Sequence, residues 1–109
     1  MPFWNRIRGV TLRENARVDE CHRRLVRLDT SQALELREAA ALSFVASSYQ
    51  CKLSVHCDHR RADALSVLEL LCLTARGGST LVLEATGPDC VRALERIEDL
   101  IRNGFDVNA

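Results

Sequence analysis

One segment in the middle of the chain alternates strictly between apolar and polar side chains. In the run from Cys51 to Cys57, the odd-numbered positions hold Cys, Leu, Val and Cys, and the even-numbered positions hold Lys, Ser and His. Successive side chains of a β-strand point to opposite faces of a sheet, so this alternation predicts a strand with one face in the core and the other in water. Strands that are buried on one face only are typical of antiparallel sheets.

Further strands and helices are expected on both sides of this segment. In chain order, the pattern predicts a strand at 25–28, a helix at 36–47, the strand at 51–57, a weaker strand at 61–64, a short helix from Ser66, a strand at 80–85 and a helix that opens at 86–89 and ends near Gly104. The run Ser66-Val67-Leu68-Glu69 matches a capping box, in which Glu69 would reach back to the Ser66 amide. Pro88 suits the first position of the last helix. We therefore expect an α+β fold, an open-faced β-sandwich with a four-stranded antiparallel sheet and three helices on one face.

The chain is short and electrically balanced. Its 109 residues suit a single domain. Lys plus Arg number 15 and Asp plus Glu also number 15, and this balance argues against a protein that binds nucleic acid by neutralising phosphates. The charge is unevenly distributed, because residues 1–28 hold seven arginines against three acidic residues. That segment carries a net charge of +4, and the rest of the chain carries −4.

Residues 1–22 are expected to form a basic extension ahead of a domain at 23–109. Apolar residues are interspersed among its arginines without forming one apolar stripe: Phe3, Trp4, Ile7, Val10 and Leu12. The extension could bind an acidic partner, lie on a membrane surface or form a disordered tail. It could also pack against the acidic body of the same chain or of a second copy, which would give self-association.

Neither a membrane span nor a signal peptide is expected, because no run of about 18 apolar residues occurs and the first residues lack an apolar core. We therefore expect a cytoplasmic protein. Its five cysteines are odd in number and form no C-x-x-C pair, a pattern that fits reduced thiols. Cys51, His56, Cys57 and His59 lie close in sequence, but the strand alternation points Cys51 and Cys57 away from His56. No metal site and no cofactor are expected.

Two runs and the order of the elements resemble a known family. The runs are Ala-Leu-Glu-Leu-Arg-Glu-Ala-Ala at 33–40 and Ser-Val-Leu-Glu-Leu-Leu at 66–71. Together with the predicted element order, they resemble HPr, the histidine phosphocarrier of the bacterial sugar phosphotransferase system. The resemblance extends from about Arg24 to the last helix.

The family's active-site pattern, Gly-Leu-His-x-Arg-Pro-Ala-Ala, is altered at its central position. Leu34 and Arg37 match this pattern, and Glu35 occupies the place of the phosphorylated histidine. Histidine suits reversible phosphoryl transfer because its pKa lies near neutrality. The resemblance therefore implies the HPr fold without the carrier step, and a regulatory or protein-binding module that is not an enzyme. Glu35 would be either a fixed charge that imitates the phosphorylated state or a carboxylate that only stabilises the helix, and Arg37 either a retained anion contact or a solvated residue.

A second family position falls on Ser66. In some members, a serine at the start of the second helix is phosphorylated by an ATP-dependent kinase. Ser66 is thus either a regulatory phosphosite, which makes a kinase-controlled regulator the alternative function, or a plain helix cap that sits close to the repelling charge of Glu69. The family also docks proteins through an apolar patch, and a regulator or a phosphotransferase component would be the partner here. The residues expected in that patch are Leu36, Val67, Leu68 and Leu71.

Overall fold

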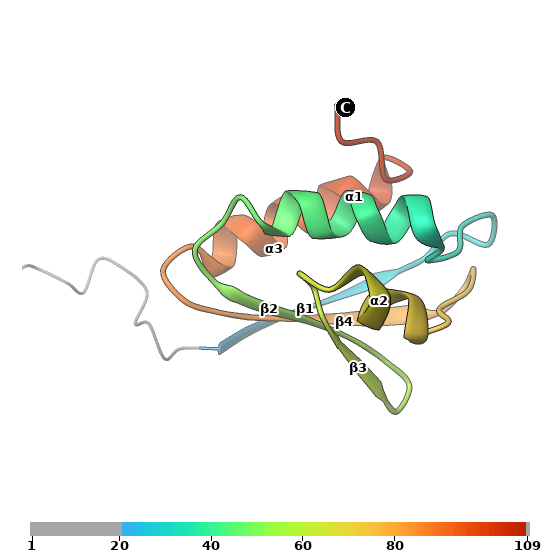
Figure 1. The fold of residues 1–109 in the computed structure, drawn as a ribbon, viewed down its shortest axis with the longest axis horizontal. Helices are drawn as coiled ribbons and strands as arrows, with labels where there is room; N and C mark the ends of the chain where they lie inside the picture. Colours follow the sequence, from blue (N-terminus) through green and yellow to red (C-terminus); the bar gives the residue numbers. More distant parts are fainter. Residues whose placement is uncertain (1–20, 109) are drawn as a thin grey trace, which may run out of the picture.

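The computed structural model describes residues 21–108, so the expectations for residues 1–20 lie outside the described part of the chain. Its elements are β1 (Cys21–Arg27), α1 (Leu36–Ala46), β2 (Lys52–Cys57), β3 (Arg60–Asp63), α2 (Val67–Cys72), β4 (Thr80–Thr86) and α3 (Cys90–Arg102). The four strands form one antiparallel sheet in the order β1-β4-β2-β3. The three helices lie on one side of this sheet, as Figure 1 shows. The expected open-faced α+β fold is confirmed.

The strand β2 bears out the alternation that predicted it, except that it begins at Lys52, so that Cys51 precedes the strand and is only half-buried. Leu53, Val55 and Cys57 are buried beneath the helices, as expected. Ser54 is only 8% exposed although it lies on the other face of the sheet. Its neighbours in the sheet are Glu84 on one side and Asp63 on the other, and side chains from both flanking strands shield a central position in this way.

The strand β1 is longer than its sequence pattern predicted. It begins at Cys21, four residues before the expected start, and pairs with β4 from Cys21 opposite Thr86 to Arg27 opposite Thr80. The added half contains Arg23, whose Nε donates to Glu84 Oε2 at 2.7 Å. The carboxylate of Glu84 on the neighbouring strand balances the charge of Arg23. Because the two residues are 61 positions apart in sequence, the arginine-rich pattern around Arg23 does not reveal this pairing.

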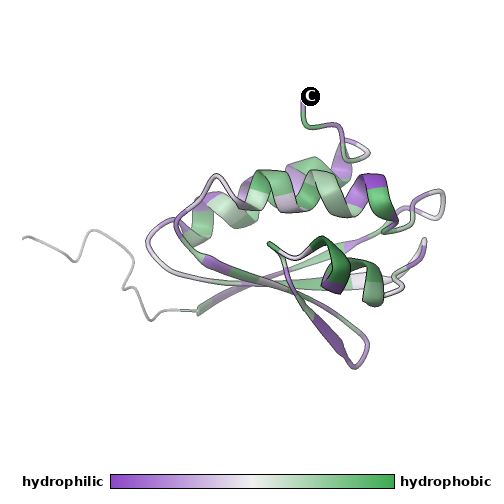
Figure 2. Ribbon diagram, viewed as in Figure 1, coloured by the Kyte–Doolittle hydropathy of each residue, from purple (hydrophilic) through white to green (hydrophobic). Residues whose placement is uncertain are grey.

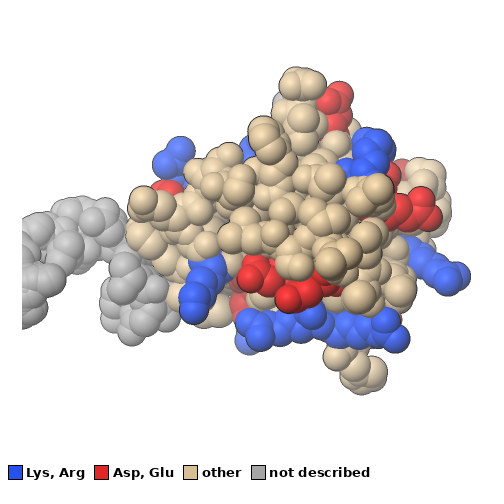
Figure 3. Space-filling model, in the orientation of Figure 1, with Lys and Arg blue, Asp and Glu red and all other residues tan. Residues whose placement is uncertain are grey.

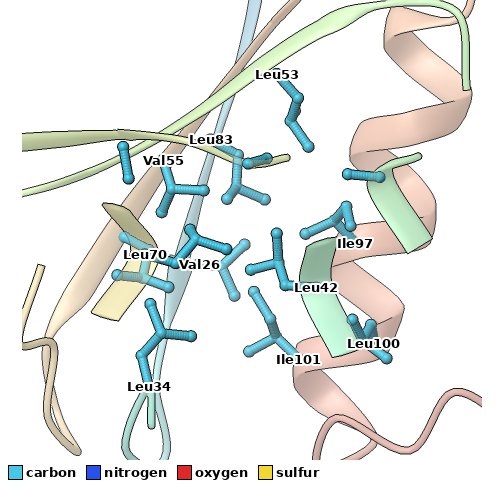
Figure 4. Close-up of a cluster of buried hydrophobic side chains, with 14 of the residues drawn as sticks. Val26, Leu34, Leu42, Leu53, Val55, Leu70, Leu83, Ile97, Leu100 and Ile101 are labelled. Carbon is cyan, nitrogen blue, oxygen red and sulfur yellow. The ribbon is translucent and has the colours of Figure 1, made fainter. Parts of the chain in front are cut away.

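The core lies between the sheet and the helices (Figure 4). Labelled side chains from every layer meet there, and the helical contribution comes mainly from α1 and α3. The largest fully buried residues are Leu28, Leu42, Leu70, Leu81, Leu83, Leu94, Ile97, Leu100, Ile101, Val55 and Cys90. Burying a leucine or isoleucine side chain contributes about 1.5–3 kcal/mol relative to leaving it exposed. This shared core fixes α1 and α3 on the sheet and leaves the outer side of α1 free of core contacts.

The start of α3 corrects one sequence expectation. Asp89, not Pro88, directly precedes the helix and is its N-cap residue. The Asp89 carboxylate accepts a hydrogen bond from the Gln50 amide at 2.9 Å, and the Asp89 amide donates to the Gln50 carbonyl at 3.2 Å. This contact with the loop before β2 fixes the residue at which the helix begins. At the other end, Gly104 (φ 74°) ends the helix as expected.

Candidate functional site

Glu35 lies at the N-terminus of α1. It is the N-cap residue, its backbone is extended (φ −102°), and it is exposed. Its amide donates to Glu38 Oε1 at 3.3 Å, which is one half of a capping box. In the other half, the Glu35 side chain faces the Glu38 backbone amide, and the amide groups of this first helical turn favour a negative charge at this position.

Arg37, which the sequence left as either an anion contact or a solvated residue, makes contacts within the protein. Its Nη2 lies 3.0 Å from Glu38 Oε2 and donates to the Gly104 carbonyl at 3.4 Å. A second link joins the same regions, because Gln32 Nε2 donates to the Ile101 carbonyl at 2.9 Å. Arg37 and Glu38 also line a cavity of about 750 Å³ between the β1–α1 loop and the end of α3. The contacts of Arg37 therefore tie α1 to α3.

The three histidines of the chain lie in the sheet region and not in α1. His22 is in β1, His56 is in β2 and His59 is in the turn between β2 and β3. His56 Nε2 lies 3.3 Å from Ser54 Oγ and also 3.3 Å from Glu84 Oε1. A hydrolytic relay needs the serine and the acid on opposite ring nitrogens, so this arrangement on a single nitrogen cannot act as one.

The open face of the sheet carries charge pairs. The hydrogen bond from Arg23 is the main cause that holds the pKa of Glu84 below its ordinary value of 4.5. Burial opposes this lowering, and the charge of Arg23 and the nearby His56 add to it.

Within the described residues, no cluster of His, Cys, Asp or Glu side chains is placed to hold a metal ion. None of the helices in this part of the chain is long and apolar enough to cross a membrane.

Ser66 is the N-cap residue of α2. The Glu69 amide donates to Ser66 Oγ at 3.2 Å, as the capping box predicts. The reciprocal half of that prediction is wrong, because the Glu69 carboxylate accepts from the Asp63 amide at 2.8 Å. The Ser66 amide instead donates to the Asp63 carbonyl at 2.9 Å. Ser66 is half-buried, and its hydroxyl already accepts the hydrogen bond that caps the helix.

Two of the four apolar residues expected to dock a partner are largely exposed to solvent. Leu36 is 65% exposed and Leu68 is 76% exposed. Val67 and Leu71 are half-buried and pack against the core. The structure therefore brings α1 and α2 together as expected, and it divides the predicted residues between the surface and the core.

Phe44 and Leu65 were missed by the sequence reading. They are 66% and 55% exposed, and Ser43 Oγ donates to the Leu65 carbonyl at 3.1 Å, which joins α1 to the residue before Ser66. A signal for Phe44 was available, since Leu36 and Phe44 are eight residues apart and so lie on one side of a helix. We name the exposed residues Leu36, Phe44, Leu65 and Leu68 the α1–α2 face. Figure 2 shows apolar colouring along both helices, and Figure 3 shows a broad surface over them with few charged side chains.

Comparison with known proteins identifies the family. The family model described as "PTS HPr component phosphorylation site" matches residues 23–103. The chain belongs to the HPr family. The match covers β1 through α3 and includes the N-terminus of α1, and it confirms the resemblance drawn from the sequence.

Individual HPr proteins support the same assignment. The chain is 35% identical to the phosphocarrier protein HPr of Treponema pallidum over 81 residues, which cover 74% of this chain and 92% of that protein. Its structure is similar to HPr-C-His from Thermoanaerobacter tengcongensis, with a TM-score of 0.73, 25% identity and coverage of 77% of this chain and 94% of that one. It is also similar to Crh of Bacillus subtilis, with a TM-score of 0.61, 26% identity and coverage of 72% and 88%. That Crh structure is described as a dimer formed by domain swapping.

Proposed function

We propose that this HPr-family chain is a cytoplasmic regulatory module that binds a protein partner and does not carry a phosphoryl group. The observation that carries the proposal is the glutamate at the N-cap of α1, the position that we assign to the family's phosphorylated histidine. The histidines of the chain lie in or beside the sheet, away from this position along the chain. The role of Glu35 is then to keep a constant negative charge at the start of α1.

The chemistry of a carboxylate supports this reading. Phosphorylation of Glu35 would form an acyl phosphate, and such transfers normally rely on cations that neutralise the charge of the moving phosphoryl group. Arg37 is the nearest cation in sequence, and its guanidinium is paired with Glu38. Nor do Ser54, His56 and Glu84 form a catalytic relay, so we infer that the chain is not an enzyme.

The α1–α2 face supplies the docking surface of the proposal. Its four large apolar side chains are exposed on α1, on α2 and in the connection that leads into α2, and exposed apolar clusters of this kind are typical of protein-binding sites. HPr-family proteins act through contact with other phosphotransferase proteins, so the partner is a component of that system or a regulator. Because Leu36, Phe44 and Leu68 make no essential core contacts, polar substitutions there should weaken binding without unfolding the domain.

An affinity experiment with matched variants tests this surface. The full chain, a Leu68→Ser variant and a Leu25→Ser variant would each capture proteins from the source organism, and the captured proteins would be compared. Leu25 is a suitable control, because it is 69% exposed but lies on β1 and not on the helices. We expect a partner that the wild type and Leu25→Ser bind and Leu68→Ser loses. Equal capture by all three proteins would exclude the α1–α2 face as the docking surface.

Regulation by phosphorylation of Ser66 is the less supported alternative. The Ser66 hydroxyl already accepts the Glu69 amide, and a phosphate there would lie close to the carboxylate of Glu69. Mass spectrometry of the protein from cells grown in rich and poor carbon sources distinguishes the two. A phosphate on Ser66 that changes with carbon source would favour the kinase-controlled regulator.

A further inference from the structure

The α1–α2 face lacks an occupant within the described residues. Its members, Leu36, Phe44, Leu65 and Leu68, are each more than half exposed. Covering such side chains removes apolar surface from water, so a segment that covers several of them is favoured. The described residues 21–108 supply no such segment, and the sequence before Cys21 is the remaining source within the same protein.

The charged residues beside this face indicate which kind of segment it would bind. Glu35 directly precedes Leu36, Glu69 directly follows Leu68, and Asp63 lies two residues before Leu65. The positive charge of Arg37 is matched by Glu38. Figure 3 shows acidic side chains beside the uncharged surface over α1 and α2 with basic side chains next to them, and Arg60 Nη1 donates to the Cys72 carbonyl at the end of α2. The acidic residues adjacent in sequence to Leu36 and Leu68 favour a segment that combines apolar and basic residues.

Residues 1–13 have this composition. They contain Arg6, Arg8 and Arg13 and no acidic residue. Large apolar residues alternate with these arginines, namely Phe3, Trp4, Ile7, Val10 and Leu12. The segment is therefore complementary to the α1–α2 face in both hydrophobicity and charge.

The segment can also reach this face. Cys21 pairs with Thr86, and Thr86 pairs with Lys52, so the start of β1 lies two strands from the start of β2. Two strand spacings amount to roughly 10 Å. Lys52 follows the end of α1 by a short loop, which places Phe44 at the same end of the molecule. Position 13 and Cys21 are separated by seven residues, so the eight Cα–Cα steps between them span up to about 26 Å when extended, which is enough to cross the sheet and reach α1.

We propose that the segment 3–13 binds the α1–α2 face of its own chain and shields it from partners. The contact is an intramolecular one, with Trp4 and its apolar neighbours on the exposed leucines and Phe44, and the arginines near Glu35 and Glu69. The binding of the segment does not depend on the proposed function. Its consequence, that a partner must displace the segment, rests on the proposed function.

Tryptophan fluorescence of the full chain tests this contact. Trp4 is the single tryptophan, so selectively excited emission reports on this segment alone. We expect the wild type to show blue-shifted emission and protection from acrylamide quenching. Phe44→Ser and Leu68→Ser should each shift the emission to longer wavelength and raise the quenching constant. Leu25→Ser, an equally exposed leucine on the sheet, should leave both unchanged.

Three outcomes would overturn the proposal: solvent-exposed emission of Trp4 in the wild type, an emission that neither Phe44→Ser nor Leu68→Ser alters, and a blue shift that disappears on dilution. The last would assign the occupant to a second copy of the chain. Circular dichroism of each variant controls for folding, and two variants at separate helices keep the test valid if one of them unfolds. No partner protein is present in the fluorescence experiment, so a negative result there does not count against the docking function. A failed partner capture likewise does not count against the contact of segment 3–13.

Discussion

The carboxylate of Glu69 accepts a hydrogen bond from the backbone amide of Asp63 at 2.8 Å. Asp63 in turn accepts the Leu65 amide on its Oδ1 at 2.9 Å. These two contacts order the connection between β3 and α2, and Ser66 caps the helix immediately afterwards. The entrance to α2, one half of the docking surface, is therefore held by polar contacts and not by core packing alone.

Removing the cap should destabilise the protein measurably. Ser66→Ala should lower the free energy of unfolding by about 1 kcal/mol, because the Glu69 amide loses its acceptor. Ser66→Asn should remain close to the wild type, since asparagine is an equally good N-cap residue. Urea unfolding of the three proteins checks this. An unchanged midpoint for Ser66→Ala would show that the hydroxyl has no capping role, and would reopen its assignment as a phosphosite.

Two glycines should respond differently to alanine. A Cβ at Gly77 would lie 2.3 Å from the Thr30 carbonyl oxygen, whereas a Cβ at Gly104 would have no neighbour within 4 Å. Gly77→Ala must therefore move backbone, at a cost of about 3 kcal/mol. Gly104→Ala meets only the strain of its left-handed conformation, about 1 kcal/mol. Thermal unfolding ranks the two, and a larger loss for Gly104→Ala would contradict the close approach of Gly77 to Thr30.

The Arg23–Glu84 pair should make stability depend on pH in the acid range. The pKa of Glu84 is lowered in the folded state, so the pair stabilises the fold above the ordinary pKa of 4.5, and this contribution disappears as the pH falls through the lowered value. Arg23→Gln should thus be less stable than the wild type at neutral pH and equally stable in strong acid. Arg61→Gln, on the same sheet face and without an ion pair among the described residues, is the control. A difference between wild type and Arg23→Gln that does not change with pH would argue against this pair.

The sequence predicted those features that depend on local patterns. Alternation identified β2, and the serine before an apolar run identified the start of α2. Features that depend on distant partners were not visible. The first half of β1 needs Glu84 to balance Arg23, and the start of α3 needs Gln50 to bind Asp89. No local rule connects residues so far apart in the chain.

The candidate site was predicted in part for the same reason. Glu35 and Ser66 lie at helix starts, which local residue types indicate, and the structure has them there. The exposure of Leu65, by contrast, depends on how the β3–α2 connection is folded by Asp63 and Glu69. Val67 and Leu71 lie on the side of α2 that faces the core, whereas Leu68 lies on the opposite side. Which side of this short helix is buried depends on how α2 packs on the sheet.

The central claim is that this HPr-family chain does not accept a phosphoryl group. Its most direct test is intact-mass spectrometry of the full chain after incubation with phosphoenolpyruvate and enzyme I of the source organism, with a histidine-bearing HPr in the same reaction as the positive control. We predict that the control gains one phosphoryl group while the mass of this chain stays unchanged. Addition of a phosphoryl group to this chain on any residue would contradict the account.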